Sequence, residues 1–152
     1  MLHIYYATDT GNAEIAAHTL GQRLGESSAV VVHDLGTRTP DDIGAADGVS
    51  LFICASCDEG QVPEHARDTF DALSTGGHDL TGIHFLAVGL GDSVYRDTYN
   101  HGCRRLVSAL ELNGARLLGE PYLHDASDGS DPVTAVEDWY RTVADALLAV
   151  PR

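Results

Sequence analysis

Short apolar runs recur along the chain, and the stretches between them place apolar residues every three or four positions. Each run is bounded by glycine, proline or acidic clusters, as is typical of strands. Several runs are apolar almost continuously, which is expected of parallel strands that helices cover on both faces. We therefore predict five strands, at residues 2–7, 29–33, 49–55, 83–89 and 116–123.

Four helices are predicted from the helical spacing of apolar residues between and after these strands. Pro63 suits the first turn of the second helix and Gly114 the end of the third, because proline opens helices and glycine closes them. Pro40, followed by two aspartates, favours a further short helix before the third strand. The apolar positions that define the four helices are Ala13, Ala16, Leu20 and Leu24; Ala66, Phe70 and Leu73; Cys103, Leu106, Val107 and Leu110; and Val133, Val136, Tyr140, Val143 and Leu147.

The alternation of strands and helices predicts a doubly wound α/β fold, with a five-stranded parallel sheet and helices on both faces. A chain of 152 residues has the size of one ordinary domain, so we expect a single domain over residues 1–152. Open sheets of this class bind ligands beyond the carboxyl ends of the strands, where the strand order reverses. The loops that follow the strands are therefore the places to look for chemistry.

The charge balance narrows the choice of partners. The chain has 23 acidic residues against 9 arginines and no lysine, which gives a formal charge of -14. Nucleic acids and anionic membranes are poor partners for such a surface. One interpretation of the acidic excess is an acidic face that steers the protein onto a basic protein partner. A composition set by the genome or by a salty habitat is the other, and both remain open.

Targeting and redox signals are weak. No apolar run approaches the roughly 18 to 20 residues that span a bilayer, and the N-terminus lacks the pattern of a secretion signal. We therefore expect a cytoplasmic protein. The cysteines Cys54, Cys57 and Cys103 are odd in number, in a domain large enough to need no disulfide, and are expected to be free thiols.

The first loop, residues 8–13, carries the strongest chemical signal, because it leads directly from the first strand into a helix. The hydroxyls of Thr8 and Thr10 and the amides of residues 11–13 can converge on a phosphate. The alternative is a helix capped by Thr10 or Asn12 without any ligand. No G-x-G-x-x-G motif follows this strand, and the chain lacks the lysine of G-x-x-x-x-G-K-[ST], so a monophosphate is favoured over dinucleotides and nucleoside triphosphates.

Three loops together resemble those of the flavodoxin family. They read T-D-T-G-N-A, A-S-C-D-E-G-Q-V-P and G-L-G-D-S-V-Y, and the similarity continues to residues 137–139. The second loop is especially similar to the FMN (flavin mononucleotide) domains of diflavin reductases. The resemblance implies the strand order 2-1-3-4-5 and a non-covalently bound FMN. The residues that it places at the cofactor are Thr8, Asp9, Thr10, Gly11, Asn12 and Ala13; Ala55, Ser56, Cys57, Asp58, Glu59 and Gly60; and Gly89, Leu90, Gly91, Asp92, Tyr95, Tyr99 and Asn100.

The resemblance also assigns roles and shows where the pattern breaks. It implies that Tyr95 stacks on the isoalloxazine ring and that Asp92 accepts hydrogen bonds around the pyrimidine part or fixes the loop. In the second loop, Cys57 replaces an aromatic residue and Asp58 replaces a glycine whose flexibility lets the peptide turn toward the reduced flavin. We therefore predict weaker FMN binding and weaker stabilisation of the one-electron-reduced flavin than in a typical member.

Two other chemistries have a sequence signal. Cys54 and Cys57 form a C-x-x-C motif, but a buried strand and an acidic loop disfavour the thiolate that redox exchange requires. The eight histidines are scattered without metal-ligand spacing, so no metal site is predicted. His65, just after the second loop, and His101, near Tyr95, are the two histidines closest to the predicted site.

The resemblance implies an electron carrier with no substrate turnover of its own. A flavin or iron-sulfur reductase would donate electrons, and a redox enzyme with a basic docking face, such as a haem monooxygenase, would accept them. We expect a monomer. One alternative is a flavin-dependent quinone or NAD(P)H oxidoreductase. Another is a flavin-free switch module of the same fold, which the absence of the expected lysine disfavours.

Overall fold

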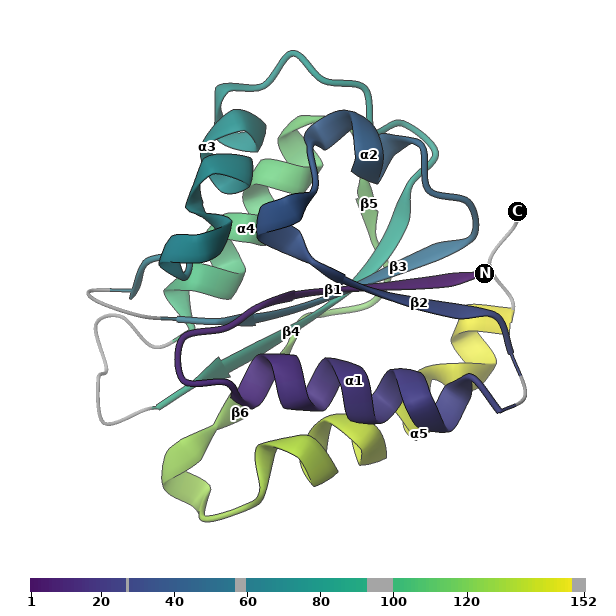
Figure 1. Ribbon diagram of the computed structural model, residues 1–152, viewed down its shortest axis with the longest axis vertical. Coiled ribbons are helices and arrows are strands. Elements are labelled where there is room, and N and C mark those ends of the chain that lie inside the picture. Colours follow the sequence, from purple (N-terminus) through teal and green to yellow (C-terminus); the bar gives the residue numbers. More distant parts are fainter. Residues whose placement is uncertain (27, 57–59, 93–99, 149–152) are drawn as a thin grey trace.

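A parallel sheet forms the centre of the molecule, with helices on both faces (Figure 1). The computed structural model describes residues 1–26, 28–56, 60–92 and 100–148, the stretch from 144 by its backbone alone. The strands are β1 (Leu2–Ala7), β2 (Val30–Asp34), β3 (Val49–Ala55), β4 (His84–Gly91), β5 (Arg116–Leu117) and β6 (Tyr122–Asp125). The helices are α1 (Asn12–Leu24), α2 (Pro40–Gly44), α3 (Arg67–Thr75), α4 (His101–Leu112) and α5 (Pro132–Leu148), with short 3-10 turns η1 (Leu35–Thr37), η3 (Glu64–Ala66) and η4 (Ala126–Asp128).

The strand order is β2-β1-β3-β4-β5, which confirms the predicted order, and β6 also pairs with β4. All of these pairs are parallel. Helices α1 and α5 cover one face of the sheet, and α2, α3 and α4 cover the other (Figure 1). The order reverses between β1 and β3, so this pair marks the place where a doubly wound sheet is open to a ligand.

The fifth strand is interrupted, in contrast to the continuous strand predicted for residues 116–123. Leu117 pairs with Phe85, and Tyr122 pairs with Val88. Between these two pairs the chain advances five residues on this segment but only three on β4. Pro121 has no amide hydrogen to donate to the ladder, and Gly119 has a left-handed backbone with φ 67°. The extra residues are accommodated as a bend that divides the strand into β5 and β6.

Other element boundaries differ from the predictions in small ways. β2 and β4 lie slightly further along the chain than residues 29–33 and 83–89. Pro63 does not lie in the first turn of α3, because its ψ of 144° is extended and the turn η3 intervenes. Gly114, with φ 98°, follows the end of α4 as predicted. The short helix α2 forms, and Thr39 and Asp42 close its capping box.

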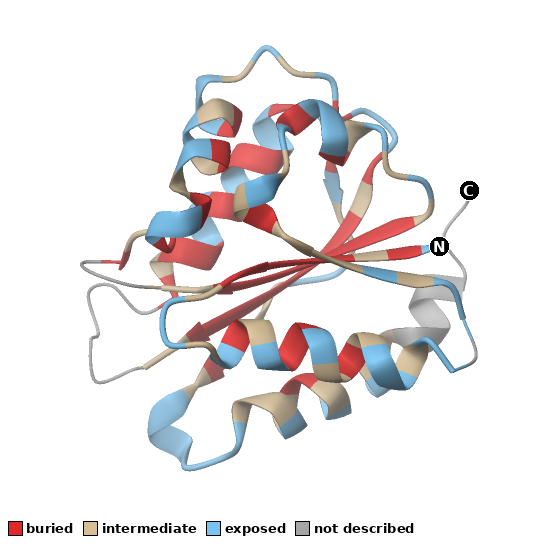
Figure 2. Ribbon diagram, viewed as in Figure 1, coloured by how far each residue is buried: buried red, intermediate tan, exposed pale blue. Residues whose placement is uncertain are grey.

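Alternate residues of the strands face two separate cores. Figure 2 shows that the central strands and parts of the helices that pack on them are buried. Ile4 and Tyr6 of β1 pack toward α1 and α5, whereas Tyr5 and Ala7 pack toward α3 and α4. Both sides of β3 and β4 are therefore apolar, which explains the nearly continuous hydrophobic runs in the sequence. In the described part of the chain, no helix is both long and apolar enough to cross a membrane.

Candidate functional site

Three loops leave the sheet at the same edge. Ala7 of β1 pairs with Cys54 of β3, and Cys54 pairs with Gly89 of β4. Because adjacent strands lie about 4.8 Å apart, the chains at Ala7 and Gly89 are separated by roughly 10 Å. The first loop (residues 8–13), the second loop (55–60) and the third loop (89–100) therefore begin side by side, at the reversal of strand order.

The first loop turns the chain from β1 into α1. Gly11 occupies the N-cap position with a left-handed backbone, φ 100° and ψ -13°. Its amide donates to Thr8 Oγ1 over 2.9 Å, which closes the loop. A Cβ at Gly11 would meet nothing within 4 Å. Glycine is therefore required here for its backbone conformation and not for space.

The start of α1 lacks a side-chain cap, so the alternative in which Thr10 or Asn12 caps the helix is wrong. The amides of Asn12, Ala13 and Glu14 precede Ile15, the first residue whose amide bonds back to Gly11, at 3.0 Å. Within the described residues these three amides have no acceptor. They point along the positive end of the helix dipole, an arrangement that suits a bound anion.

A histidine from further along the chain holds the first residue of this loop. The Thr8 amide donates to His65 Nε2 over 2.8 Å. His65 Nδ1 lies 2.9 Å from Asp34 Oδ1, and the same oxygen accepts the Gly36 amide at 2.8 Å. From the sequence, His65 stands out only by its position after the second loop, and Asp34 and Gly36 were not predicted. The three residues come from separate segments, so no local pattern in the sequence joins them.

The second loop lies against the start of α4. The Ser56 amide donates to Leu90 O over 3.2 Å, and Ser56 Oγ accepts the Gly102 amide at 2.9 Å. A Cβ at Gly102 would lie 2.9 Å from both Ser56 Oγ and Gln61 O, so only glycine fits. Gly102 was not predicted. The predicted residues Cys57, Asp58 and Glu59 lie outside the described residues, and their roles stay predictions.

The two ends of the third loop are packed on one another. Asn100 is 0% exposed and left-handed, with φ 53°, and its Nδ2 donates to His124 O over 3.1 Å. A Cβ at Gly89 would lie 2.5 Å from Asn100 Oδ1, and one at Gly91 would lie 2.9 Å from its Cγ. These two glycines therefore make room for Asn100. Two further predicted residues, Tyr95 and Tyr99, lie outside the described residues.

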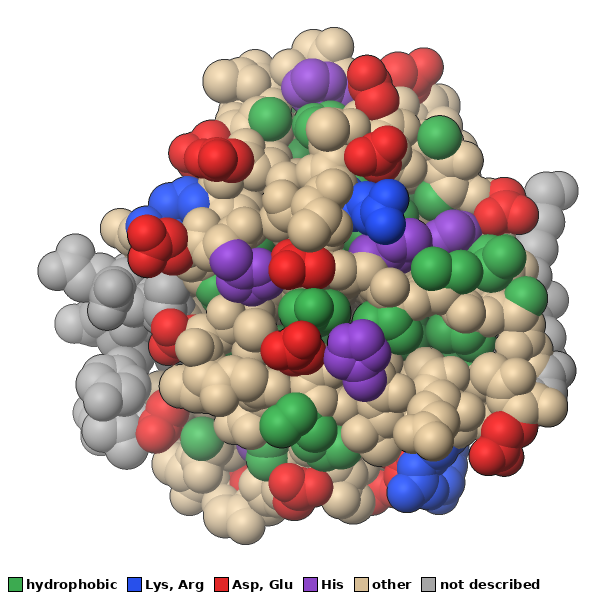
Figure 3. Space-filling view, viewed as in Figure 1, with side chains coloured by type: hydrophobic (Ala, Val, Ile, Leu, Met, Phe, Trp, Pro, Cys, Tyr) green, Lys and Arg blue, Asp and Glu red, His purple; other side chains and the backbone are tan. Residues whose placement is uncertain are grey.

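An acidic turn borders the third loop. Asp125, at the end of β6, pairs with Gly91 of β4. The turn continues to Asp128 and Asp131, which accept the amides of Ser130 at 2.7 Å and Thr134 at 3.0 Å. Hydrogen bonds from Ser130 and from Thr134 lower the pKa of the two carboxyls. They are therefore ionised at neutral pH and add fixed negative charge at this edge. Figure 3 shows acidic side chains spread over one face of the molecule, with few arginines among them.

The described cysteines do not suit thiol redox chemistry. Cys54 and Cys103 are both buried, and burial raises the pKa of the Cys103 thiol to about 12. A thiol with such a pKa forms almost no thiolate near neutral pH. Cys57, the other half of the C-x-x-C motif, is outside the described residues. Among the residues that the structure describes, no group of three or more His, Cys, Asp or Glu side chains could hold a metal ion.

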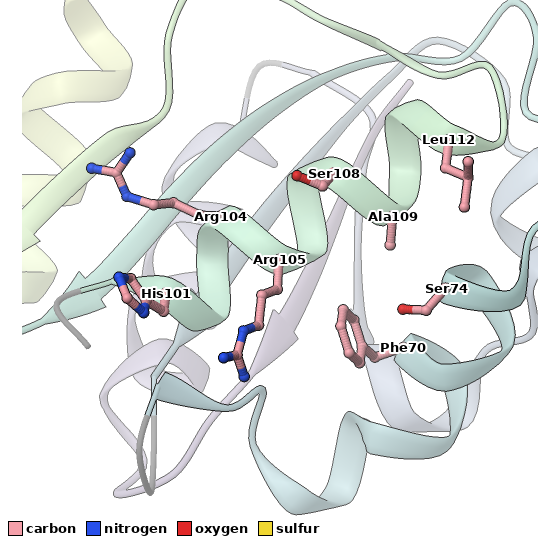
Figure 4. Close-up of a pocket in the computed structure, with 8 residues that line it drawn as sticks. All are labelled: Phe70, Ser74, His101, Arg104, Arg105, Ser108, Ala109 and Leu112. Carbon is pink, nitrogen blue, oxygen red and sulfur yellow. The ribbon is translucent and has the colours of Figure 1, made fainter. Parts of the chain in front are cut away.

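A groove of about 590 Å³ lies between α3 and α4 (Figure 4). It runs along α4 from His101 to Leu112, on the outside of the helix layer and not across the strand ends. Arg104 and Arg105 point to different sides, so their guanidinium groups do not converge on one anion (Figure 4). The groove is therefore a poorer candidate for a phosphate-bearing cofactor than the three loops.

The donor set of the first loop fits a phosphate ester. The free amides at the start of α1 and the threonine hydroxyls beside them are neutral donors, and the loop contains no arginine. Neutral donors together with a helix dipole can hold a phosphate without a cation. A doubly wound sheet with such a helix start at its strand-order reversal defines a protein that binds a phosphate-bearing cofactor.

Comparisons with known proteins identify the family. The flavodoxin family model matches residues 4–139. Protein MioC of Escherichia coli K12 is 28% identical over 129 residues, which are 85% of this chain and 86% of MioC. The beta subunit of sulfite reductase from Saccharomyces cerevisiae is 28% identical over 154 residues, 96% of this chain but only 11% of that protein. A structure of flavodoxin from Pseudomonas aeruginosa, 24% identical, superposes with a TM-score of 0.81 and covers 97% of this chain and 99% of that one.

The chain belongs to the flavodoxin family. Its cofactor is FMN, and it is an electron-transfer flavoprotein. The expected fold and cofactor are thereby confirmed. The match to sulfite reductase is confined to a small part of that enzyme, so the activity of the whole enzyme is not carried over.

Proposed function

We propose that this protein binds FMN between its three loops and shuttles single electrons from a reductase to a redox enzyme, without substrate turnover of its own. The uncapped start of α1 carries this proposal. There the amides of Asn12, Ala13 and Glu14, which follow Gly11, have no acceptor within the described residues. They lie at the place in the sheet where a cofactor phosphate is expected. The proposed phosphate site consists of Thr8, Asp9, Thr10, Gly11, Asn12 and Ala13.

The flavin ring lies, in this proposal, between the second and third loops. Ser56 is anchored to α4 through Gly102, and the ends of the third loop are anchored through Asn100. Both loops therefore have fixed starting points on either side of the proposed ring. Stacking by Tyr95 and a less favourable peptide turn at Cys57 and Asp58 complete the proposed ring site.

Negative charge around the ring has two expected effects. Asp125, Asp128 and Asp131 place carboxylates beside the third loop, and Asp92 lies within it. These charges disfavour the anionic, fully reduced flavin, so the protein is a strong electron donor. They also favour an acceptor with a basic docking face. A flavin or iron-sulfur reductase is the proposed donor, a haem monooxygenase is one candidate acceptor, and the protein is expected to work as a monomer in the cytoplasm.

A flavin-dependent oxidoreductase that acts on quinones is the competing function. Such an enzyme needs a substrate pocket beside the ring, in contact with the reacting nitrogen. The groove between α3 and α4 follows the helix layer and does not cross the strand ends, so it supplies no such pocket. Among the described residues, this groove therefore gives no support to the competing enzyme.

The visible spectrum of the purified protein during stepwise anaerobic reduction tests the proposal. FMN is added first if the preparation is colourless. We expect stoichiometric FMN, reduction in two separate one-electron steps, and only a small amount of the one-electron-reduced form because of Cys57 and Asp58. The protein should not oxidise NADPH or NADH when a quinone is supplied without a reductase.

Each result has a distinct meaning. Failure to bind FMN at micromolar concentration would refute the proposed site. Rapid oxidation of NADPH with a quinone would establish the competing enzyme. A large amount of the blue, neutral one-electron-reduced form would leave the carrier in place but contradict the prediction for the second loop.

A further inference from the structure

We propose that His65 is a positioning residue for the first loop, and that FMN binding weakens when the His65 ring gains a proton. This inference rests on the proposed phosphate site in that loop. His65 belongs to η3, after the second loop, and it is separated from Thr8 by 57 positions in the sequence. It therefore acts on the phosphate site through the backbone of Thr8.

The hydrogen bonds define one tautomer of the neutral ring. The Thr8 amide is a donor, so His65 Nε2 must be the acceptor and carry no proton, at a distance of 2.8 Å. The proton then lies on Nδ1, which donates to Asp34 Oδ1 over 2.9 Å. Asp34 thus fixes the tautomer that receives the Thr8 amide, in the way that a carboxylate commonly orients a histidine.

The backbone around this pair is closely fitted. Asp34 Oδ1 also accepts the Gly36 amide at 2.8 Å, so its position is set by the turn at the end of β2. A Cβ at Gly36 would lie 1.9 Å from the backbone oxygen of His65, so the two segments touch. The ring is only 31% exposed, and Tyr6 of β1 lies on its side with ring centroids 6.2 Å apart. His65 therefore has little freedom to turn away from Thr8.

Protonation of His65 would remove the acceptor of the Thr8 amide. A ring that carries a proton on both nitrogens has only donors, and Nε2-H would face the N-H of Thr8. Thr8 Oγ1 accepts the Gly11 amide at 2.9 Å, so a shift of Thr8 is passed to the helix start where the phosphate is expected. A positive ring would also attract the phosphate. Loss of positioning would weaken FMN binding at low pH, whereas charge attraction would strengthen it. The direction in which FMN affinity changes with pH therefore distinguishes the two effects.

Within the described residues, the titratable groups around His65 come from β1, β2, α1 and η3 itself. Asp34 lies against the ring from β2, and Glu64 precedes it in the chain. Burial, followed by the hydrogen bond to Glu14, raises the pKa of Tyr6 above 10, so Tyr6 stays neutral. His18 of α1 also contacts Tyr6, with ring centroids 5.6 Å apart, but in the described part of the chain no hydrogen bond joins it to the first loop. His18 is therefore a matched control.

Calorimetric titration of the apoprotein with FMN and with riboflavin, at pH 5.5 and 7.5, tests the inference. His65→Phe keeps a ring against Tyr6 but removes both hydrogen bonds, and FMN should bind about tenfold more weakly at pH 7.5. Riboflavin has no phosphate, so its affinity should not change. His65→Gln keeps an acceptor that does not titrate, so it should bind FMN nearly as well as wild type at pH 7.5.

Between pH 7.5 and 5.5 the wild type should lose about tenfold more FMN affinity than His65→Gln. Protonation of the FMN phosphate, with a pKa near 6, affects every variant equally and cancels in this comparison. His18→Gln should behave as wild type. If His65→Phe does not fold, the pH profiles of wild type and His65→Gln still decide the question.

The failures can be told apart. If the wild type does not bind FMN, the proposed function fails. If the wild type binds FMN and neither His65 variant differs from it, only the role of His65 is refuted. If FMN affinity of the wild type rises toward pH 5.5 relative to His65→Gln, charge attraction dominates and the positioning role is also refuted.

Discussion

Replacement of Gly11 by alanine isolates the backbone requirement of the first loop. Gly11 has φ 100°, beyond the left-handed region that other residues tolerate, and a Cβ there would meet nothing within 4 Å. Gly82 is a matched control, because it has φ 91° and is equally open. It lies before β4, at the opposite edge of the sheet from the three loops. Both substitutions introduce the same strain, but only Gly11→Ala should disturb the proposed phosphate site.

The strain should cost each apoprotein about 1 to 2 kcal/mol. For a domain of this size that lowers Tm by about 3 to 6 °C. In Gly11→Ala, relief of the strain would turn the amides of α1 away from the phosphate. The loss of one charge-assisted hydrogen bond, about 1.5 to 3 kcal/mol, reduces FMN affinity by roughly 10- to 100-fold.

Thermal unfolding with and without FMN measures both effects. A ligand at 100 times its Kd stabilises the native state by about 2.7 kcal/mol. At that FMN concentration, wild type and Gly82→Ala should gain the full increase in Tm, whereas Gly11→Ala should gain much less. If Gly11→Ala and Gly82→Ala gained equal amounts, the first loop would not be the phosphate site.

Two further predictions concern the stability of the apoprotein. Burial, followed by the charges of Arg38 and His3, lowers the pKa of His33 in the folded protein below 6.5. The neutral form of His33 therefore stabilises the fold above pH 6.5, and this stabilisation is lost as the pH falls through the pKa of the folded state. Urea unfolding of wild type at pH 7.5 and 5.5 should show that loss, and a His33→Gln variant with the same pH dependence would contradict it. Thr39→Ala removes the capping box of α2 and should lower the free energy of unfolding by about 1 kcal/mol. Thr37→Ala, in the turn η1 and outside α2, removes one exposed hydrogen bond to Asp34 O and should cost less in the same experiment.

The sequence was most informative about the sheet. Buried strands such as β3 carry apolar residues almost continuously, and this local signal is visible without tertiary structure. The break between β5 and β6 was harder to predict. Residues 116–123 have a high strand propensity, and only the pairing with β4 shows that the strand is interrupted near Pro121. The position of Pro63 was also hard to predict, because the turn η3 lies between Pro63 and the start of α3.

The candidate site could be proposed from the sequence where its residues lie in one continuous stretch. The first loop contains its hydroxyls, its glycine and its helix start within residues 8–13, so its pattern can be read directly. The supporting residues lie elsewhere. His65 and Asp34 meet because η3 packs against the turn η1 that follows β2, and Gly102 is required because α4 begins beneath the second loop. Such contacts depend on packing and leave no local pattern.

The anchoring of the third loop has a consequence for how its sequence can change. Asn100 fills the space beside Gly89 and Gly91, so the chain returns to the point from which it left. Contacts within the protein therefore offset the entropy cost of closing the loop. That cost grows only slowly with loop length, by about 0.6 kcal/mol for each doubling of the length. A change in the number of residues between the two anchors therefore costs the sheet little. Such changes therefore bear more on the proposed FMN site and on partner docking than on the stability of the fold.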